Sequence, residues 1–215
     1  MPGECTFCRK FGEGSHDRRE WYDDPLASTA NSLLVPAIGA FVEGYVMIVA
    51  KRHYAAMANL PSHEFVEFMA FKQQVQEIVR EAYGTVLMFE HGVADSKISP
   101  GTCVDHAHWQ ILPFESDIIP HLKRTYGGRF VRSFEDLRRP RLRNRSYMYV
   151  EAEQGVCFVT YPRTAVPSQY IRRIVSKELG CEDCWDWAMF PYWDKVAATI
   201  SRLKTFIGEP GVVEQ

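Results

Sequence analysis

The 215-residue sequence has no excess of charge of either sign. It carries 25 Lys and Arg residues against 27 Asp and Glu residues, which gives a formal net charge of −2 at pH 7. Dedicated nucleic-acid binders normally show a strong basic excess, because neutralising backbone phosphates supplies much of their affinity. The charge balance therefore argues against a protein dedicated to binding nucleic acids.

Long apolar runs are also lacking. No segment approaches the roughly eighteen consecutive apolar residues of a membrane span, and the N-terminal MPGECTFCRK lacks the apolar core of a signal peptide. We therefore expect a soluble, cytoplasmic protein without a membrane partner. In that compartment the six cysteines are expected to be thiols or metal ligands rather than disulfides.

The pattern of apolar residues predicts an α+β fold. With 46% hydrophobic residues the chain can bury a proper core. Alternation and helical spacing predict strands over 32–38, 45–50, 86–90 and 104–113, and a helix that is capped by Ser62 and stopped by Gly84. This order implies a mainly antiparallel sheet with helix cover.

The sequence pattern in the second half of the chain predicts further elements that are added to that core. The expected elements are a loop over the basic run 138–145, a hairpin of strands 146–150 and 156–161, and a short helix over 169–179. We expect residues 1–115 to form the core and residues 116–215 to form a C-terminal extension packed on it.

The segment VDHAHWQILP at 104–113 carries the most chemical information. Alternation along a strand places His106, His108 and Gln110 on one face, while Trp109 and Ile111 fall on the opposite, core-facing side. A neutral imidazole can attack phosphorus at physiological pH without first losing a proton. Taken alone, this row is compatible with a metal site, a catalytic site or coincidence.

Four segments together resemble the histidine triad superfamily. HAHWQILP resembles its motif, and CTFC at 5–8, LLVPAIGAFVEGYVMIVAKRHY ending at Tyr54 and FEHG at 89–92 agree with the family in order and spacing. Further on, VPSQYIRRIVSKELG and WDWAMFP resemble the C-terminal extension of larger bacterial members. The resemblance covers residues 4–113 well and the remainder weakly.

The third position of the triad is Gln110 rather than a histidine. In this respect the sequence resembles the nucleotidyl-transferring branch of the superfamily, which includes galactose-1-phosphate uridylyltransferase and dinucleoside tetraphosphate phosphorylase. The resemblance implies that His108 is the nucleophile and forms a nucleotidyl-histidine intermediate. The Gln110 amide can donate a hydrogen bond to a phosphoryl oxygen but cannot give a proton to a leaving group. Substrates whose leaving groups are stable anions are therefore expected.

A structural zinc ion is implied by the same resemblance. The two-residue spacing of Cys5 and Cys8 lets both thiolates reach one zinc. In zinc-bearing relatives the ligands match Cys5, Cys8, His53 and His106, a closed set of four. The alternatives are a redox or unpaired thiol pair, and an all-cysteine site completed by a second CxxC motif at Cys181 and Cys184.

The expected substrate contacts lie in two places. Relatives contact phosphate through a Gly and polar residues just before the catalytic strand, which here are Gly101, Thr102 and Cys103. We expect the base and sugar to lie against the first hairpin, around Leu34, Pro36 and Phe41. Glu90 would repel a phosphate unless its carboxylate is turned away or bound to a ribose hydroxyl.

These inferences predict a nucleotidyltransferase or phosphorylase that acts on a nucleoside phosphoanhydride or nucleotide sugar. The alternatives are a hydrolase that releases a nucleoside monophosphate and a nonenzymatic nucleotide-binding module, although a mere binder needs no nucleophile. The resemblance also implies a homodimer, and the aromatic residues of 185–193 could cover its interface or pack the extension onto its own core.

Overall fold

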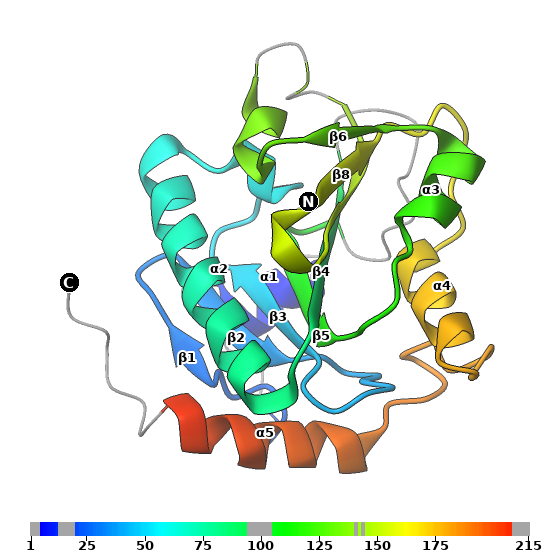
Figure 1. Cartoon of the computed structure of the whole chain (residues 1–215). Helices are drawn as coiled ribbons and strands as arrows, with labels where there is room; N and C mark the ends of the chain where they lie inside the picture. Colours follow the sequence, from blue (N-terminus) through cyan, green and yellow to red (C-terminus); the bar gives the residue numbers. More distant parts are fainter. Residues whose placement is uncertain (1–4, 13–19, 94–104, 140–141, 143–144, 208–215) are drawn as a thin grey trace.

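The computed structural model describes residues 5–12, 20–93, 105–139, 142 and 145–207. Its strands form one sheet in the order β1-β2-β3-β5-β4-β7-β8-β6, in which all neighbours are antiparallel (Figure 1). The strands are β1 (Ala27–Ser28), β2 (Ser32–Pro36), β3 (Val46–Ala50), β4 (Val86–Gly92), β5 (His108–Pro113), β6 (Arg129–Val131), β7 (Tyr147–Glu151) and β8 (Cys157–Thr160). The predicted α+β fold is confirmed.

Five α-helices surround the sheet within the described residues. They are α1 (Thr6–Phe11), α2 (Ser62–Tyr83), α3 (Ile119–Tyr126), α4 (Tyr170–Glu178) and α5 (Trp193–Ile207). Short 3-10 turns are η2 (Met57–Asn59), η3 (Phe134–Arg138) and η4 (Glu153–Gly155). Gly84 ends α2 with a φ of 89°, as predicted, but Pro61 and not Ser62 occupies its N-cap.

Alternation along the strands sorts the apolar residues onto two faces of the sheet. One face packs against α2 and includes Ile48, Met88 and Trp109. The other face packs against α3 and α4 and includes Leu87 and Leu112. These two surfaces are named the α2 face and the α4 face. Helix α5 crosses one end of the sheet (Figure 1) and contributes to both cores.

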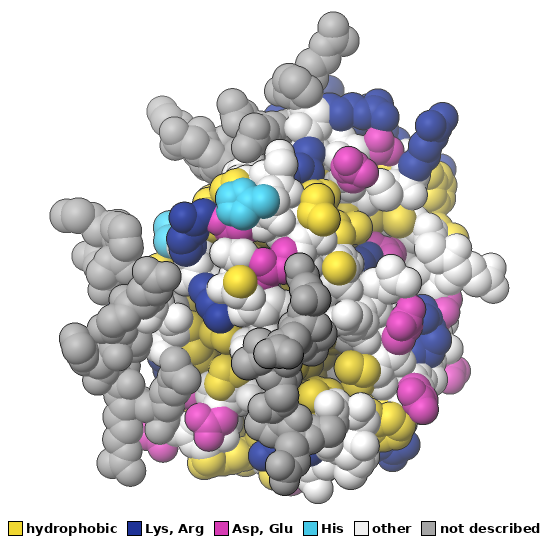
Figure 2. All heavy atoms as spheres, turned by 90° about the vertical axis from the view of Figure 1, so that its left-hand side faces the viewer, with side chains coloured by type: hydrophobic (Ala, Val, Ile, Leu, Met, Phe, Trp, Pro, Cys, Tyr) yellow, Lys and Arg dark blue, Asp and Glu magenta, His cyan; other side chains and the backbone are white. Residues whose placement is uncertain are grey.

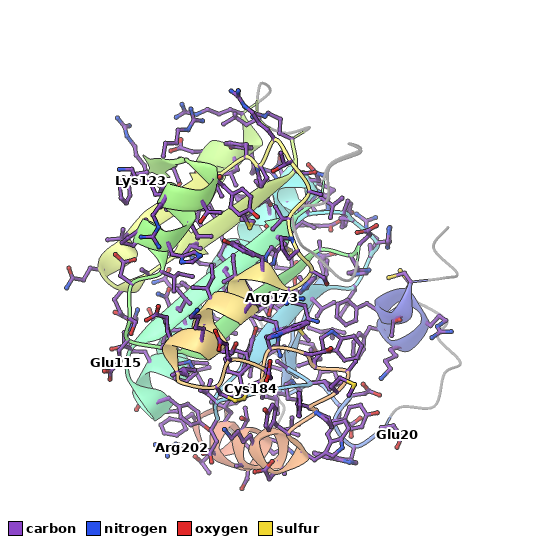
Figure 3. The ribbon with its side chains drawn as sticks, turned by 90° about the vertical axis from the view of Figure 1, so that its right-hand side faces the viewer. Glu20, Glu115, Lys123, Arg173, Cys184 and Arg202 are labelled. Carbon is purple, nitrogen blue, oxygen red and sulfur yellow. A yellow bond between two sulfur atoms is a disulfide. The ribbon has the colours of Figure 1, made fainter. Side chains whose placement is uncertain are left out.

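Helix α1 also packs on the α4 face, over β2 and β3. Phe11 contacts a small cluster of buried residues there, formed by Leu33, Val35 and Val49. Figure 3 views this side of the molecule and shows α1 standing apart from α4. On this one face, the middle of the sheet therefore lies between α1 and α4.

The structure contains α3, β6 and α5, which the sequence pattern did not predict. β6 is a three-residue edge strand whose Arg129 and Phe130 are exposed, so it lacks the alternation of a half-buried strand. α5 buries only Val196, Thr199 and Leu203, which is a narrow stripe for a 15-residue helix. Both elements are positioned by tertiary contacts more than by local pattern.

Cys181 and Cys184 form a disulfide, so the expectation of thiols or metal ligands is wrong for this pair. The chain reverses after α4 at Gly180, which has a φ of 75°. The next turn runs over 181–184, where the Cys184 backbone N–H donates a 3.3 Å hydrogen bond to the Cys181 backbone oxygen, and it brings the two Cα atoms to 5.5 Å, a separation that a disulfide can bridge. Cys5, Cys8 and Cys157 are free.

The exterior agrees with the balanced composition. Acidic and basic side chains are interspersed over most of the face shown in Figure 2. Among the described residues, no helix combines the length and the apolarity that crossing a bilayer requires.

Candidate active site and metal centre

A cavity of about 490 Å³ lies on the α4 face, over the central strands of the sheet. Its floor is formed by Met47 of β3, His91 of β4, and His108 and Gln110 of β5. The walls come from α1 and from the segment 187–193 that follows α4. The volume falls within the range of small-molecule sites. The structure thus brings the predicted nucleophile and Gln110 together in one cavity.

His108 is held in the tautomer that a nucleophile needs. Its Nδ1 lies 2.7 Å from the backbone oxygen of His106. A carbonyl oxygen only accepts hydrogen bonds, so Nδ1 carries the proton and Nε2 keeps its lone pair. Burial lowers the pKa of His108, which keeps the ring neutral at physiological pH. The Nε2 lone pair is therefore available without a base.

Gln110 is oriented by a phenol. The Tyr45 hydroxyl donates a buried hydrogen bond to Gln110 Oε1. With its oxygen directed to the Tyr45 hydroxyl, the amide has its NH₂ group left to donate to a ligand in the cavity. The site therefore presents a hydrogen-bond donor at the third position of the motif.

Cys5, Cys8, His53 and His106 form a cluster that could hold a metal ion. Their ligand atoms lie within 4.8 Å of one another. Cys5 Sγ lies 3.4 Å from His106 Nδ1, and Cys8 Sγ lies 3.3 Å from His53 Nδ1. The corresponding edge of a tetrahedral zinc site with typical bond lengths is about 3.6 Å. The donor set and its spacing thus fit a tetrahedral ion.

His106 is prepared as a ligand by its second nitrogen. Nε2 donates a 2.7 Å hydrogen bond to the Ala50 backbone oxygen, which leaves the Nδ1 lone pair directed to the cysteines. Burial lowers the pKa of His106 to about 4, so the ring is neutral. Burial and the neighbouring Cys5 raise the pKa of Cys8 to about 11, so a bound cation would displace its proton.

The cluster of Cys5, Cys8, His53 and His106 lies next to His108. Phe7, which lies between the two cysteines in sequence, packs edge-on against His106 at 5.5 Å and His108 at 5.6 Å between ring centroids. His106 also precedes β5 rather than forming part of it, yet its backbone orients His108. A metal ion in this cluster would hold α1 in place as a wall of the cavity.

Of the other residues predicted to contact substrate, the structure places only some at the cavity. Pro36 lines the cavity, whereas Leu34 and Phe41 do not. Leu34 points to the α2 core because it alternates with Leu33 and Val35, and Phe41 packs beneath the Arg172 guanidinium at 4.9 Å. Gly101, Thr102 and Cys103 lie outside the described residues.

Glu90 is turned away from the cavity. Its carboxylate accepts a 2.6 Å hydrogen bond from the Met57 backbone N–H and another from the Tyr147 hydroxyl, on the α2 face. Burial raises the pKa of Glu90 to about 8. The carboxylate therefore does not oppose a phosphate at His108. The disulfide removes Cys181 and Cys184 from the rival all-cysteine site.

Several lining residues were not singled out from the sequence. His91 reaches the floor because β4 pairs with β5, with Phe89 opposite Gln110. The far wall carries Gln169, Arg172, Trp187 and Trp193, all from the C-terminal extension. Alternation with Leu87 and Phe89 would have assigned His91 to this face, but only the strand pairing brings it next to His108.

No family model and no curated protein matches the chain. Among solved structures, the chain is similar to a hypothetical histidine triad nucleotide-binding protein from Sulfolobus tokodaii, with 15% identity, a TM-score of 0.40, and 95% of this chain and 97% of that chain covered. A second is a zinc-bound histidine triad family protein from Mycobacterium smegmatis, with 20% identity, a TM-score of 0.39, and 54% and 78% covered.

A third similar structure is a yeast Ap4A phosphorylase in complex with AMP, with 13% identity and a TM-score of 0.40. It covers 87% of this chain and 76% of that chain. The structural neighbours of this chain thus include histidine triad proteins and a yeast Ap4A phosphorylase, all at low identity.

Proposed function

We propose that this protein is a nucleotidyltransferase or phosphorylase that cleaves a nucleoside phosphoanhydride or a nucleotide sugar through a nucleotidyl-His108 intermediate. The observation that carries the proposal is the pairing of two oriented side chains in one cavity. His108 keeps a free Nε2 lone pair because its Nδ1 proton is engaged, and Gln110 has its NH₂ group left to donate because its oxygen accepts from Tyr45.

The two half-reactions need no acid or base from the protein when the leaving group and the acceptor are anions. His108 Nε2 forms a bond to the α-phosphorus, and the bond from phosphorus to the leaving oxygen breaks with its electron pair. An acceptor phosphate oxygen then attacks the same phosphorus and returns the electron pair to Nε2. Gln110 donates to a nonbridging oxygen, where negative charge grows in both transition states.

The nucleoside moiety is proposed to lie toward the aromatic end of the cavity. Tyr22, Trp187 and Trp193 line the cavity, and Tyr22 and Trp193 stack at 4.6 Å between centroids, which defines the aromatic end. Flat aromatic side chains offer a base a stacking surface without selecting one base strongly. Pro36 lines the same cavity, and Gly101, Thr102 and Cys103 stay proposed phosphate contacts.

The cluster of Cys5, Cys8, His53 and His106 is proposed to hold a structural zinc ion. Four protein ligands leave no position for water or substrate, so the ion would supply only cross-linking. It would tie α1, which carries Phe7, to the strand that carries His108.

The proposed function is tested by incubating the protein with dinucleoside polyphosphates, nucleotide sugars and adenylylsulfate, followed by intact-mass measurement after rapid quenching. We expect a mass increase of one nucleotidyl group, that is, a nucleoside monophosphate less one water, because the intermediate is covalent. Binding of these compounds without any adduct or product would instead support a nucleotide-binding module.

Gln110→His is expected to shift products from transfer toward hydrolysis. An imidazole at this position can exchange a proton with water, which the amide cannot. The measurement is the product ratio in ¹⁸O-labelled water with and without phosphate, and Gln73→His on the exposed side of α2 is the matched control. If the wild-type protein already places label quantitatively in the nucleoside monophosphate, whatever acceptor is present, it is a hydrolase.

We also propose a homodimer. Met189 and Phe190 are 70% and 42% exposed beside the cavity wall, so apolar surface remains after the extension has packed on the sheet. Light scattering at micromolar concentration should then give twice the 24.8 kDa mass of the chain. A mass of one chain would reject the dimer.

A further inference from the structure

We propose that His91 is a third imidazole of the active site, which donates a hydrogen bond from Nε2–H to a nonbridging oxygen of the phosphoryl group that His108 attacks. This inference rests on the proposed function and adds a catalytic residue to it. The motif on β5 has Gln110 at its third position, so it contributes no third imidazole. His91 would contribute one from the neighbouring strand β4.

Strand pairing places His91 beside the nucleophile. β4 and β5 are antiparallel, with Phe89 opposite Gln110, so the next residue of β4 on the same face is His91 and that of β5 is His108. Both rings line the cavity. His91 also packs edge-on against Phe89 at 5.7 Å between ring centroids, which holds its ring over the floor of the cavity.

The Nε2 atom of His91 is buried and has no hydrogen-bond partner among the described residues. The whole side chain is only 5% exposed. Nearly all buried polar atoms in native proteins are paired, so an unpaired nitrogen at the cavity floor indicates a ligand that pairs it. His108 forms part of the same floor, so we assign that ligand as the phosphoryl group that His108 attacks.

The charges around the cavity favour a neutral donor at this position. Lys10 pairs with both carboxylate oxygens of Asp23, at 2.7 and 2.8 Å. The Arg172 guanidinium donates to the backbone oxygens of Gly39 and Trp185. Lys10 and Arg172, the two cations that line the cavity among the described residues, are therefore engaged with protein groups, and the phosphoryl group is expected to depend on donors such as Gln110 and His91.

The protonation state agrees with a donor that keeps its proton. Burial and, to a lesser extent, the neighbouring His108 lower the pKa of His91 to about 3, so the ring is neutral at physiological pH. Phosphoryl oxygens only accept hydrogen bonds, so the tautomer that binds them carries its proton on Nε2. In this role no proton moves. The bond from His108 Nε2 to phosphorus forms, and the leaving anion departs with its electron pair. His91 stabilises, through its hydrogen bond, the nonbridging oxygen on which negative charge grows.

The kinetic test compares His91→Phe, which keeps the ring shape but removes both nitrogens, with His91→Gln, which keeps a donor near the Nε2 position. His91→Phe should slow formation of the nucleotidyl-His108 adduct by about 10²-fold or more, as loss of one preorganised donor does. His91→Gln should recover most of that rate, and KM should change less than kcat. His63→Gln, whose side chain is 76% exposed, is the control and should match the wild type.

Two kinetic results would overturn the assignment. Adduct formation by His91→Phe within threefold of the wild-type rate would mean that the imidazole does nothing, and His91→Gln as slow as His91→Phe would mean that donation is not what the ring supplies. Either result would leave the covalent intermediate on His108, and so the proposed function, intact.

A second measurement on the unmodified protein does not depend on turnover. With ¹⁵N-labelled histidine, the Nε2 resonance of His91, assigned by its loss in His91→Gln, should be that of a protonated neutral ring. It should shift when inorganic phosphate or a nucleoside monophosphate is added. An unchanged resonance at saturating nucleotide would reject the contact. A shift in a protein that forms no adduct with any substrate would support the contact while rejecting the proposed function.

Discussion

His108→Ala is expected to lower kcat by about four orders of magnitude or more, on whichever substrate the panel identifies. Removing a nucleophile deletes the covalent route itself, whereas ground-state contacts to the nucleotide stay in place. Nucleotide affinity should therefore stay within about tenfold of that of the wild type. The measurements are steady-state kinetics, nucleotide titration monitored by the fluorescence of Trp187 and Trp193, which line the cavity, and intact mass.

The control for this change is His63→Ala, which removes an exposed imidazole of α2 far from the motif in sequence. It should retain wild-type turnover and the nucleotidyl adduct. If His108→Ala kept near-wild-type activity, or if the adduct were mapped to another residue, the role of His108 would be wrong.

Cys8→Ser is expected to abolish binding of one zinc ion per chain and to lower the melting temperature with it. The four proposed ligands come from α1 and its N-cap residue, from the segment after β3 and from the residues before β5, and the unfolded chain does not bring them together. Metal binding is therefore linked to folding, so the stability it adds is lost when a ligand is removed. The measurements are metal analysis and thermal unfolding, each with and without a chelator.

The matched control is the double variant Cys181→Ser/Cys184→Ser, which removes the other CxxC pair. It should keep its zinc, because that pair forms a disulfide and belongs to no cluster of metal-ligating residues in the described chain. Full zinc occupancy in Cys8→Ser, or loss of zinc only in the control, would reject the proposed ligand set.

Loss of zinc should also weaken nucleotide binding, although the ion touches no substrate. Phe7 lies between Cys5 and Cys8 and packs against His108, so α1 would be both part of the proposed metal centre and a wall of the cavity. Chelation should therefore raise the Kd for a nucleoside monophosphate in the wild type and leave it unchanged in Cys8→Ser.

Local sequence patterns were sufficient to predict the strands and helices that bury one face and follow one period. The strands around Leu33 and Ile48, the helix that begins at Ser62, and the hairpin of β7 and β8 were all predicted from alternation, helical spacing and glycine positions. β6 and α5 were not, because an exposed three-residue edge and a helix with a narrow buried stripe carry little periodic signal.

The sequence by itself determined the chemistry of one strand. The two-residue period puts His108 and Gln110 on one side and Trp109 on the other, and this depends only on backbone geometry. The tertiary structure decided everything that depends on register and on contacts between distant segments. It placed Leu34 in the core and turned Glu90 away, assigned a tautomer to His108 through a neighbouring carbonyl, and brought His91 beside it across two paired strands. Those outcomes follow from which strands pair and what packs on them, and no local period encodes either.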